Sequence, residues 1–172
     1  MPGAPQPYQT SWCGIDPGTA GGSGAPVTLL GVFSFAADGY IVALKYFRDN
    51  ADSFNHMGYV TNPSTGVMLG VANFKNHSGG AAGPAGWETA YLHPRLPVFA
   101  SDKRAVGVYF GGSYFYYDAG ALASNGFVCG DVLTDQDGVP FPNMQFSYST
   151  LDSGFSSSGG SRYGIDLVFL AK

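Results

Sequence analysis

Charged side chains are scarce in this sequence. Asp, Glu, Lys and Arg make up 12% of the 172 residues, which is about half the share of an ordinary globular domain. The eight Lys and Arg residues are scattered, and the formal net charge is −4. Binding of nucleic acid phosphates needs clustered positive charge. We therefore predict no nucleic acid partner.

Long apolar runs are also missing. A membrane-spanning helix needs a run of about 18 apolar residues, and none occurs. The opening MPGAPQPYQTSW lacks the basic region and apolar stretch of a secretion signal. We expect no membrane insertion. An exported protein would then have lost its signal beforehand, or would leave the cell by another route, such as a virus particle.

Side chains that commonly perform catalysis are few. Glu88 is the only glutamate, and no partner carboxylate for acid–base work can be identified. His56, His77 and His93 are 21 and 16 residues apart, so we predict unrelated surface histidines. A G-x-S-x-G nucleophile turn and a phosphate-binding glycine loop are both missing. We predict that the protein is not an enzyme, with no catalytic residue and no metal centre.

One acidic stretch and one cysteine pair leave alternatives open. In GDVLTDQDG, Asp135 and Asp137 match part of a calcium loop, but Val139 occupies a ligand position and no later Glu closes the loop. We predict an ordinary Asp-Gly turn and no cofactor, with bound Ca²⁺ as the alternative. Cys13 and Cys129 can form one disulfide or remain thiols.

Glycine and aromatic residues, in contrast, are abundant. The 26 glycines and the 15% of aromatic residues are typical of all-β proteins with tight turns. Short strand candidates are separated by Gly, Pro, Asn or Asp: 27–36, 40–48, 66–74, 87–92, 104–110, 113–118, 144–149 and 163–170. The first two are predicted to form a hairpin or a pair crossing between sheets. We predict a β-sandwich or jelly roll of antiparallel strands with little helix.

The N-terminal region has a different composition. Residues 1–26 contain five Pro and six Gly, which predicts an extended segment. Such an arm can dock on a neighbouring subunit or lie on the surface of its own domain. We divide the chain into an extended arm, residues 1–17, and a single β-sandwich domain, residues 18–172, which is large enough to fold around one core.

Four consecutive aromatic residues stand out in GGSYFYYDAGAL. Side chains alternate along a strand, so one face is expected in the core and the other at the surface. An exposed tyrosine pair can stack on a sugar ring, although packing is the commoner role of an aromatic in a strand. The candidate binding residues are Tyr114, Tyr116, Tyr117 and Asp118. Trp87 is a further stacking candidate, but we expect it to be a buried core residue.

Several stretches in order carry a family resemblance: DPGTAGGSGAPVTLLGVFSFAADGYIVALKYFRD, GVMLGVANFKN, GWETAYLHPRLPV, RAVGVYFGGSYFYYDAGAL and SRYGIDLVFL. Together they resemble an uncharacterised β-sandwich module of bacterial extracellular proteins that is also similar to modules in bacteriophage tail proteins. The resemblance covers about residues 16–170. It implies a sandwich or jelly roll with a binding or structural role, and it supplies no catalytic residues.

Two functions follow as expectations. The first is a virion component at the exterior of a bacteriophage, in a tail, fibre or head, that contacts other virion subunits or the host surface as a homo-oligomer. The alternative is an extracellular carbohydrate-binding or adhesion module from a larger secreted bacterial protein, with a cell-surface glycan as its partner. The longer Gly-Ala loop in NHSGGAAGPAGW and the added Pro-rich arm depart from the module's usual pattern and weaken the idea of an accessory module of an enzyme.

Overall fold

A computed structural model of the chain describes residues 8–22, 25–52, 56–74, 84–111, 114–122, 126–134, 144–148, 156–157 and 161–172. All regular structure in these residues is β-strand. Within the same ranges we find no helix that could cross a membrane. The strands pair antiparallel, so the prediction of an all-β protein with antiparallel strands is confirmed.

The strands are short and follow one another closely along the chain. In order they are β1 Thr19–Gly22, β2 Val27–Phe35, β3 Gly39–Arg48, β4 His56–Thr61, β5 Met68–Asn73, β6 Gly86–Val98, β7 Lys103–Phe110, β8 Tyr114–Asp118, β9 Phe127–Cys129, β10 Val132–Thr134, β11 Met144–Ser147, β12 Ser156–Ser157, β13 Arg162–Tyr163 and β14 Ile165–Ala171.

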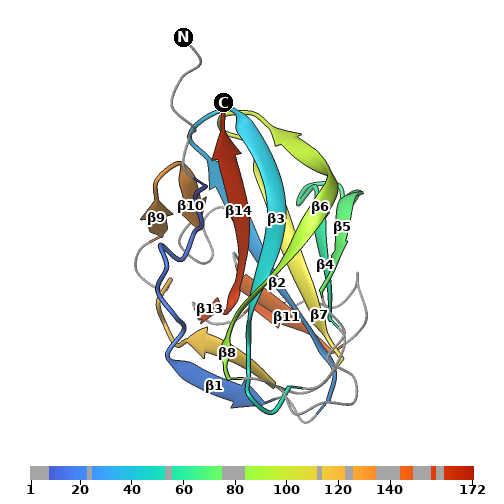
Figure 1. Cartoon of the computed structure of the whole chain (residues 1–172), viewed down its shortest axis with the longest axis vertical. Helices are drawn as coiled ribbons and strands as arrows, with labels where there is room; N and C mark the ends of the chain where they lie inside the picture. Colours follow the sequence, from blue (N-terminus) through green and yellow to red (C-terminus); the bar gives the residue numbers. More distant parts are fainter. Residues whose placement is uncertain are drawn as a thin grey trace.

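These strands form three sheets (Figure 1). The largest has the order β12-β11-β2-β7-β4-β5, with β10 also paired to β2 and β9 paired to β10. A second sheet, which we call the front sheet, has the order β14-β3-β6. The third, β1-β8-β13, lies at the lower end of the view in Figure 1.

The core lies between the front sheet and the largest sheet. Leu44 of β3 and Leu167 of β14 have no exposed surface, and they belong to one cluster with Leu29, Val106 and Val108 of the largest sheet. Alternate side chains of each strand point into this layer, as expected for two sheets packed face to face. The apolar residues that gave the strand pattern therefore build a sandwich-like core.

The structure decides one alternative that the sequence left open and corrects the end of one predicted strand. The segments 27–36 and 40–48 form β2 and β3, which lie in different sheets, so the pair crosses between sheets and is not a hairpin. The strand predicted over 87–92 is longer in the structure, because β6 continues to Val98 through Pro94 and Pro97. An edge strand tolerates proline because one side of its backbone needs no ladder hydrogen bonds, and β6 is an edge strand.

The N-terminal segment, residues 8–17, lies against the domain's own strands. Gln9 exchanges backbone hydrogen bonds with Phe169 of β14 at 2.8 Å in both directions. The Trp12 side chain is 1% exposed. Cys13 is bonded to Cys129 in a disulfide, which resolves the alternative that the sequence left open.

Candidate functional site

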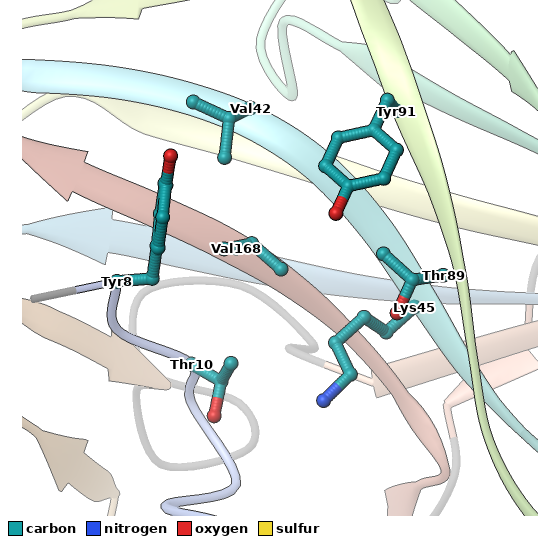
Figure 2. Close-up of a pocket in the computed structure, with 7 residues that line it drawn as sticks. All are labelled: Tyr8, Thr10, Val42, Lys45, Thr89, Tyr91 and Val168. Atoms are coloured by element: carbon teal, nitrogen blue, oxygen red, sulfur yellow. The ribbon is translucent and has the colours of Figure 1, made fainter.

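A groove crosses the outer face of the front sheet, on the side away from the core. Its volume is about 290 Å³, at the lower end of the usual range for small-molecule sites. Figure 2 shows Tyr8 of the N-terminal segment on one side and Tyr91 of β6 on the other. The complete lining is Tyr8, Thr10, Val42, Lys45, Thr89, Tyr91 and Val168.

A β-bulge in β3 explains why Val42 and Lys45 both face this groove. Strict alternation would place these two side chains on opposite faces of the strand. However, the register shifts between Ile41 and Ala43, and Val42 has no partner in either neighbouring strand. An extra residue in one strand reverses the direction of the side chains beyond it. Ile41 therefore faces the core together with Leu44, whereas Val42 and Lys45 face outward.

A buried carboxylate fixes the N-terminal segment beside the groove. Asp166 of β14 has no exposed surface. It accepts hydrogen bonds from the Ser11 amide at 2.8 Å, the Ser11 hydroxyl at 2.7 Å and the Trp12 amide at 3.2 Å. Burial raises the pKa of Asp166, and these hydrogen bonds oppose the shift. The segment that presents Tyr8 and Thr10 is thus attached through its backbone.

Arg162 adds a second attachment for the same segment. Its guanidinium donates a hydrogen bond to the Ser11 carbonyl and lies between two rings, 3.8 Å from the Trp12 centroid and 4.0 Å from the Phe127 centroid. Burial lowers the pKa of Arg162 to about 10, partly offset by Asp166. Stacking on aromatic faces suits a guanidinium that has lost part of its water.

Lys45 lies at the floor of the groove and is positioned by an aromatic ring. Its ammonium is 4.8 Å from the centroid of the Trp87 ring. Trp87 is half-buried, which corrects our expectation of a fully buried core residue. It packs against Trp12 and Phe47 with centroid distances of 5.8 and 5.4 Å. The Trp87 indole therefore forms a supported surface beneath the lysine.

The chemistry of the groove combines exposed rings with hydrogen-bonding groups. Tyr8 and Tyr91 are 68% and 66% exposed, so their ring faces are open to solvent. In Figure 2, Val42 and Val168 lie between the two rings, and the Thr10 and Thr89 hydroxyls and the Lys45 ammonium lie below the rings in the view. A ligand with flat apolar faces and many hydroxyl groups matches this arrangement.

The aromatic strand that the sequence singled out, β8, is placed differently. Tyr116 is half-buried and packs on Phe47, with ring centroids 4.9 Å apart. Tyr117 and Phe115, on the other face, pack against the core. Tyr114 belongs to β8, but its side chain lies outside the described residues. The structure thus gives Tyr116 and Tyr117 packing contacts and does not bring them to the groove.

The remaining predicted site residues are also separate from the groove. Asp118 is half-buried and accepts a hydrogen bond from the Gly18 amide at 2.7 Å. Asp135 and Asp137, the possible calcium ligands, lie outside the described residues. Within the described part of the chain, no three His, Cys, Asp or Glu side chains come together as a metal site.

One histidine departs from the prediction of a surface position. His56 is 3% exposed, and its Nε2 lies 2.5 Å from a carboxylate oxygen of Asp52. The ring packs against Tyr46 and Phe110 at centroid distances of 4.6 and 4.9 Å. Burial also raises the pKa of the Tyr46 hydroxyl. This Asp–His pair is enclosed by aromatic rings, which is the environment of a packed polar pair in a core.

Comparisons with known proteins show a structural likeness but no family match. No protein-family model matches the chain, and no curated protein matches it. The solved structure of the clostridial cysteine protease Cwp84, after propeptide cleavage, is similar with a TM-score of 0.57 and 12% identity. The likeness covers 96% of this chain and 40% of that chain, so the present chain spans less than half of the protease.

This likeness contradicts the prediction that the protein is not an enzyme, because the similar chain is a protease. We withdraw that prediction. At 12% identity the likeness shows the fold alone, so no catalytic residue is carried over. A thiol nucleophile is not available in this chain while Cys13 and Cys129, its only cysteines, are bonded to each other.

The sequence contained weak signals for the groove. Tyr91 and Thr89 alternate with buried Ala90 and Leu92 along β6, a pattern that marks an outward face. Strict alternation places Lys45 and Val42 on opposite faces of the strand, and the bulge that brings them together leaves no mark in local composition. Tyr8 was not predicted as a groove residue, because it belongs to residues 1–17, which we expected to form an extended arm.

Proposed function

We propose that the protein binds a glycan in the groove between Tyr8 and Tyr91, as an extracellular carbohydrate-binding or adhesion module. The observation that carries this proposal is the pair of exposed tyrosine rings on either side of a groove lined by hydroxyl groups. The apolar face of a sugar ring stacks on such aromatic side chains, while its hydroxyls form hydrogen bonds at the edges. The small volume suits a short stretch of an oligosaccharide.

An oxidising environment agrees with this proposal. The Cys13–Cys129 disulfide joins the N-terminal segment to the residue that ends β9. Disulfides persist in secreted and surface proteins and are rare in the cytosol of most organisms. We class the fold as a β-sandwich on the basis of its two facing sheets. The jelly-roll connectivity and the extended arm remain predictions.

Titration with oligosaccharides tests the proposal. We would use hexasaccharides of glucose, N-acetylglucosamine and galacturonic acid, and measure binding by calorimetry. Tyr91→Ala is expected to weaken binding at least about tenfold, which corresponds to roughly 1.4 kcal/mol, whereas Tyr91→Phe keeps the ring and most of the affinity. Tyr148→Ala is the matched control, because Tyr148 is 63% exposed but lies outside the groove.

Two outcomes would contradict glycan binding in the groove. One is the failure of all three hexasaccharides to bind at millimolar concentration. The other is binding that Tyr91→Ala and Tyr148→Ala leave equally unchanged, since the ligand would then contact another surface.

A second candidate function, subunit assembly, is favoured by strand β5. This strand ends the order of the largest sheet, and within the described residues its outer edge pairs with no other strand. Val67, Met68, Leu69 and Val71 are 38–57% exposed, and residues 57–74 contain no charged side chain. Exposed apolar edges without charges favour pairing with another strand. A second copy of β5 in antiparallel register is the occupant we propose.

This assembly matches the expectation of a homo-oligomeric virion subunit, and its test is the oligomeric state in solution. Sedimentation of the wild type should show a dimer, and Val71→Lys should convert it to a monomer. Thr65→Lys is a control in the exposed loop before β5. A wild-type monomer at high micromolar concentration would contradict assembly through β5.

A further inference from the structure

The groove carries a positive charge that no carboxylate of its lining balances. Lys45 is the one charged residue of the lining, and none of the seven lining residues is acidic. Within the described residues, the Lys45 ammonium lies over the face of the Trp87 ring. A cation held on an aromatic face keeps its hydrogen-bonding protons available to a ligand.

The carboxylates of the front sheet are occupied elsewhere. Asp166 is the cross-strand neighbour of Lys45, but it has no exposed surface and accepts hydrogen bonds from Ser11, Trp12 and Leu167. Glu88 of β6 forms an ion pair with Arg48 at 3.1 Å. The adjoining N-terminal residues 8–13 contain no charged side chain. The Lys45 charge is therefore left for a ligand.

Further positive charge lies on the same sheet and at its end. Arg95 of β6 stacks on Tyr40 of β3, with its guanidinium carbon 4.1 Å from the ring centroid. Lys172, which follows β14, has its ammonium 5.1 Å from the same centroid. Besides the paired Arg48, the front sheet and its end thus present three cations, although the protein as a whole carries a net charge of −4. A local positive field of this kind attracts anionic ligands at low ionic strength.

From these observations we propose that the glycan bound in the groove is acidic, with the carboxylate of a uronic acid residue paired to Lys45. This inference rests on the proposed glycan binding and adds the ligand's charge to it. The sugar ring would stack on Tyr91, and the carboxylate would accept hydrogen bonds from the Lys45 ammonium and from Thr89 or Thr10. A charge-assisted pair of this type is roughly twice as strong as a neutral hydrogen bond.

The experiment compares an acidic with a neutral probe on four proteins: the wild type, Lys45→Gln, Lys45→Arg and Lys172→Gln. The probes are the hexasaccharides of galacturonic acid and of glucose, measured at low and at high salt. In the wild type we expect the acidic probe to bind at least about tenfold more tightly at low salt, and we expect this ratio to fall as salt screens the charges.

The variants identify the charge that is responsible. Lys45→Gln should remove the preference for the acidic probe, so that the ratio of acidic to neutral binding falls to about one. Lys45→Arg should retain most of the preference, because the positive charge remains. Lys172→Gln removes the same charge outside the groove and should keep the ratio close to that of the wild type.

The outcomes separate the two proposals. Equal binding of both probes, or a preference that Lys45→Gln leaves unchanged, would overturn the acidic ligand while glycan binding stands. If Lys172→Gln lowers the ratio as much as Lys45→Gln does, the preference is a general charge effect and the pairing to Lys45 is wrong. If neither probe binds, the acidic ligand is wrong, and glycan binding is wrong as well if the N-acetylglucosamine hexasaccharide also fails to bind.

Discussion

The carboxylate of Asp166 accepts two hydrogen bonds from Ser11, one from the backbone amide and one from the hydroxyl, at 2.8 and 2.7 Å. These two residues are 155 positions apart in the chain. Their contact fixes the N-terminal segment to β14 and places Tyr8 at the edge of the groove. The buried carboxylate thus links the stability of the fold to the geometry of the proposed site.

Asp166→Asn is expected to destabilise the protein by about 2–4 kcal/mol, because an amide leaves part of this buried hydrogen-bonding set without an acceptor. Denaturant unfolding measures this loss. Asp16→Asn is the control, since Asp16 lies exposed in the same segment and should change stability by less than about 0.5 kcal/mol. Equal stability of the two variants would show that the buried carboxylate does not hold the segment.

The contribution of Asp166 should depend on pH. Burial raises its pKa in the folded state above the ordinary carboxyl value. The folded protein then binds this proton more tightly than the unfolded chain does, so stability rises as pH falls through the folded pKa. The difference in unfolding free energy between wild type and Asp166→Asn should be larger near pH 4 than near pH 7, by roughly 1.4 kcal/mol for each unit of pKa shift. A difference that grows toward neutral pH would contradict this sign.

The Cys13–Cys129 disulfide closes a loop with a sequence separation of 116 residues. Its loss is expected to cost about 4–5 kcal/mol according to the chain-entropy model. Cys13→Ser, Cys129→Ser and the double variant should lose the same amount, because each removes one and the same bond. Thermal unfolding under non-reducing conditions measures it. Additive losses would show that the two cysteines act separately. No loss at all would show that the disulfide does not stabilise the fold.

Gly107 of β7 permits close packing of a tyrosine. A Cβ at this position would overlap the ring of Tyr59, which is 1% exposed. Gly107→Ala is therefore expected to destabilise the protein by about 1–3 kcal/mol through forced displacement of the ring. Gly86→Ala is the matched control, because a Cβ there meets no atom within 4 Å. Calorimetric melting should separate the two variants, and equal melting temperatures would refute this packing.

Much of the fold could be predicted from local sequence patterns. The apolar alternation and the Gly or Asp turn residues located β2, β3 and β7 to within a few residues. The pattern could not show which sheet each strand joins, because pairing depends on contacts between distant segments. Strand β4 was not predicted, although the Asp and Asn residues of DNADSFN mark a turn before His56.

The candidate site was harder to predict for three physical reasons. The bulge at Val42 reverses the side-chain direction within a strand, and no residue type marks it. Tyr8 reaches the groove through tertiary contacts made by Ser11 and Trp12. The consecutive aromatic residues of β8 predicted a binding face on that strand. In the structure, however, Tyr116 packs on Phe47 and Tyr117 packs on the core.

Chemical-shift mapping with ¹⁵N-labelled protein tests the central claim most directly. On titration with the galacturonic acid hexasaccharide, the account predicts that the largest shifts of backbone amides cluster at Thr10, Val42, Lys45, Tyr91 and Val168, the residues around the groove. Amides of β8, such as that of Tyr116, should stay within the range of unaffected residues. Shifts centred on β8 or on β5, or no shifts at millimolar ligand, would contradict binding of an acidic glycan in the groove.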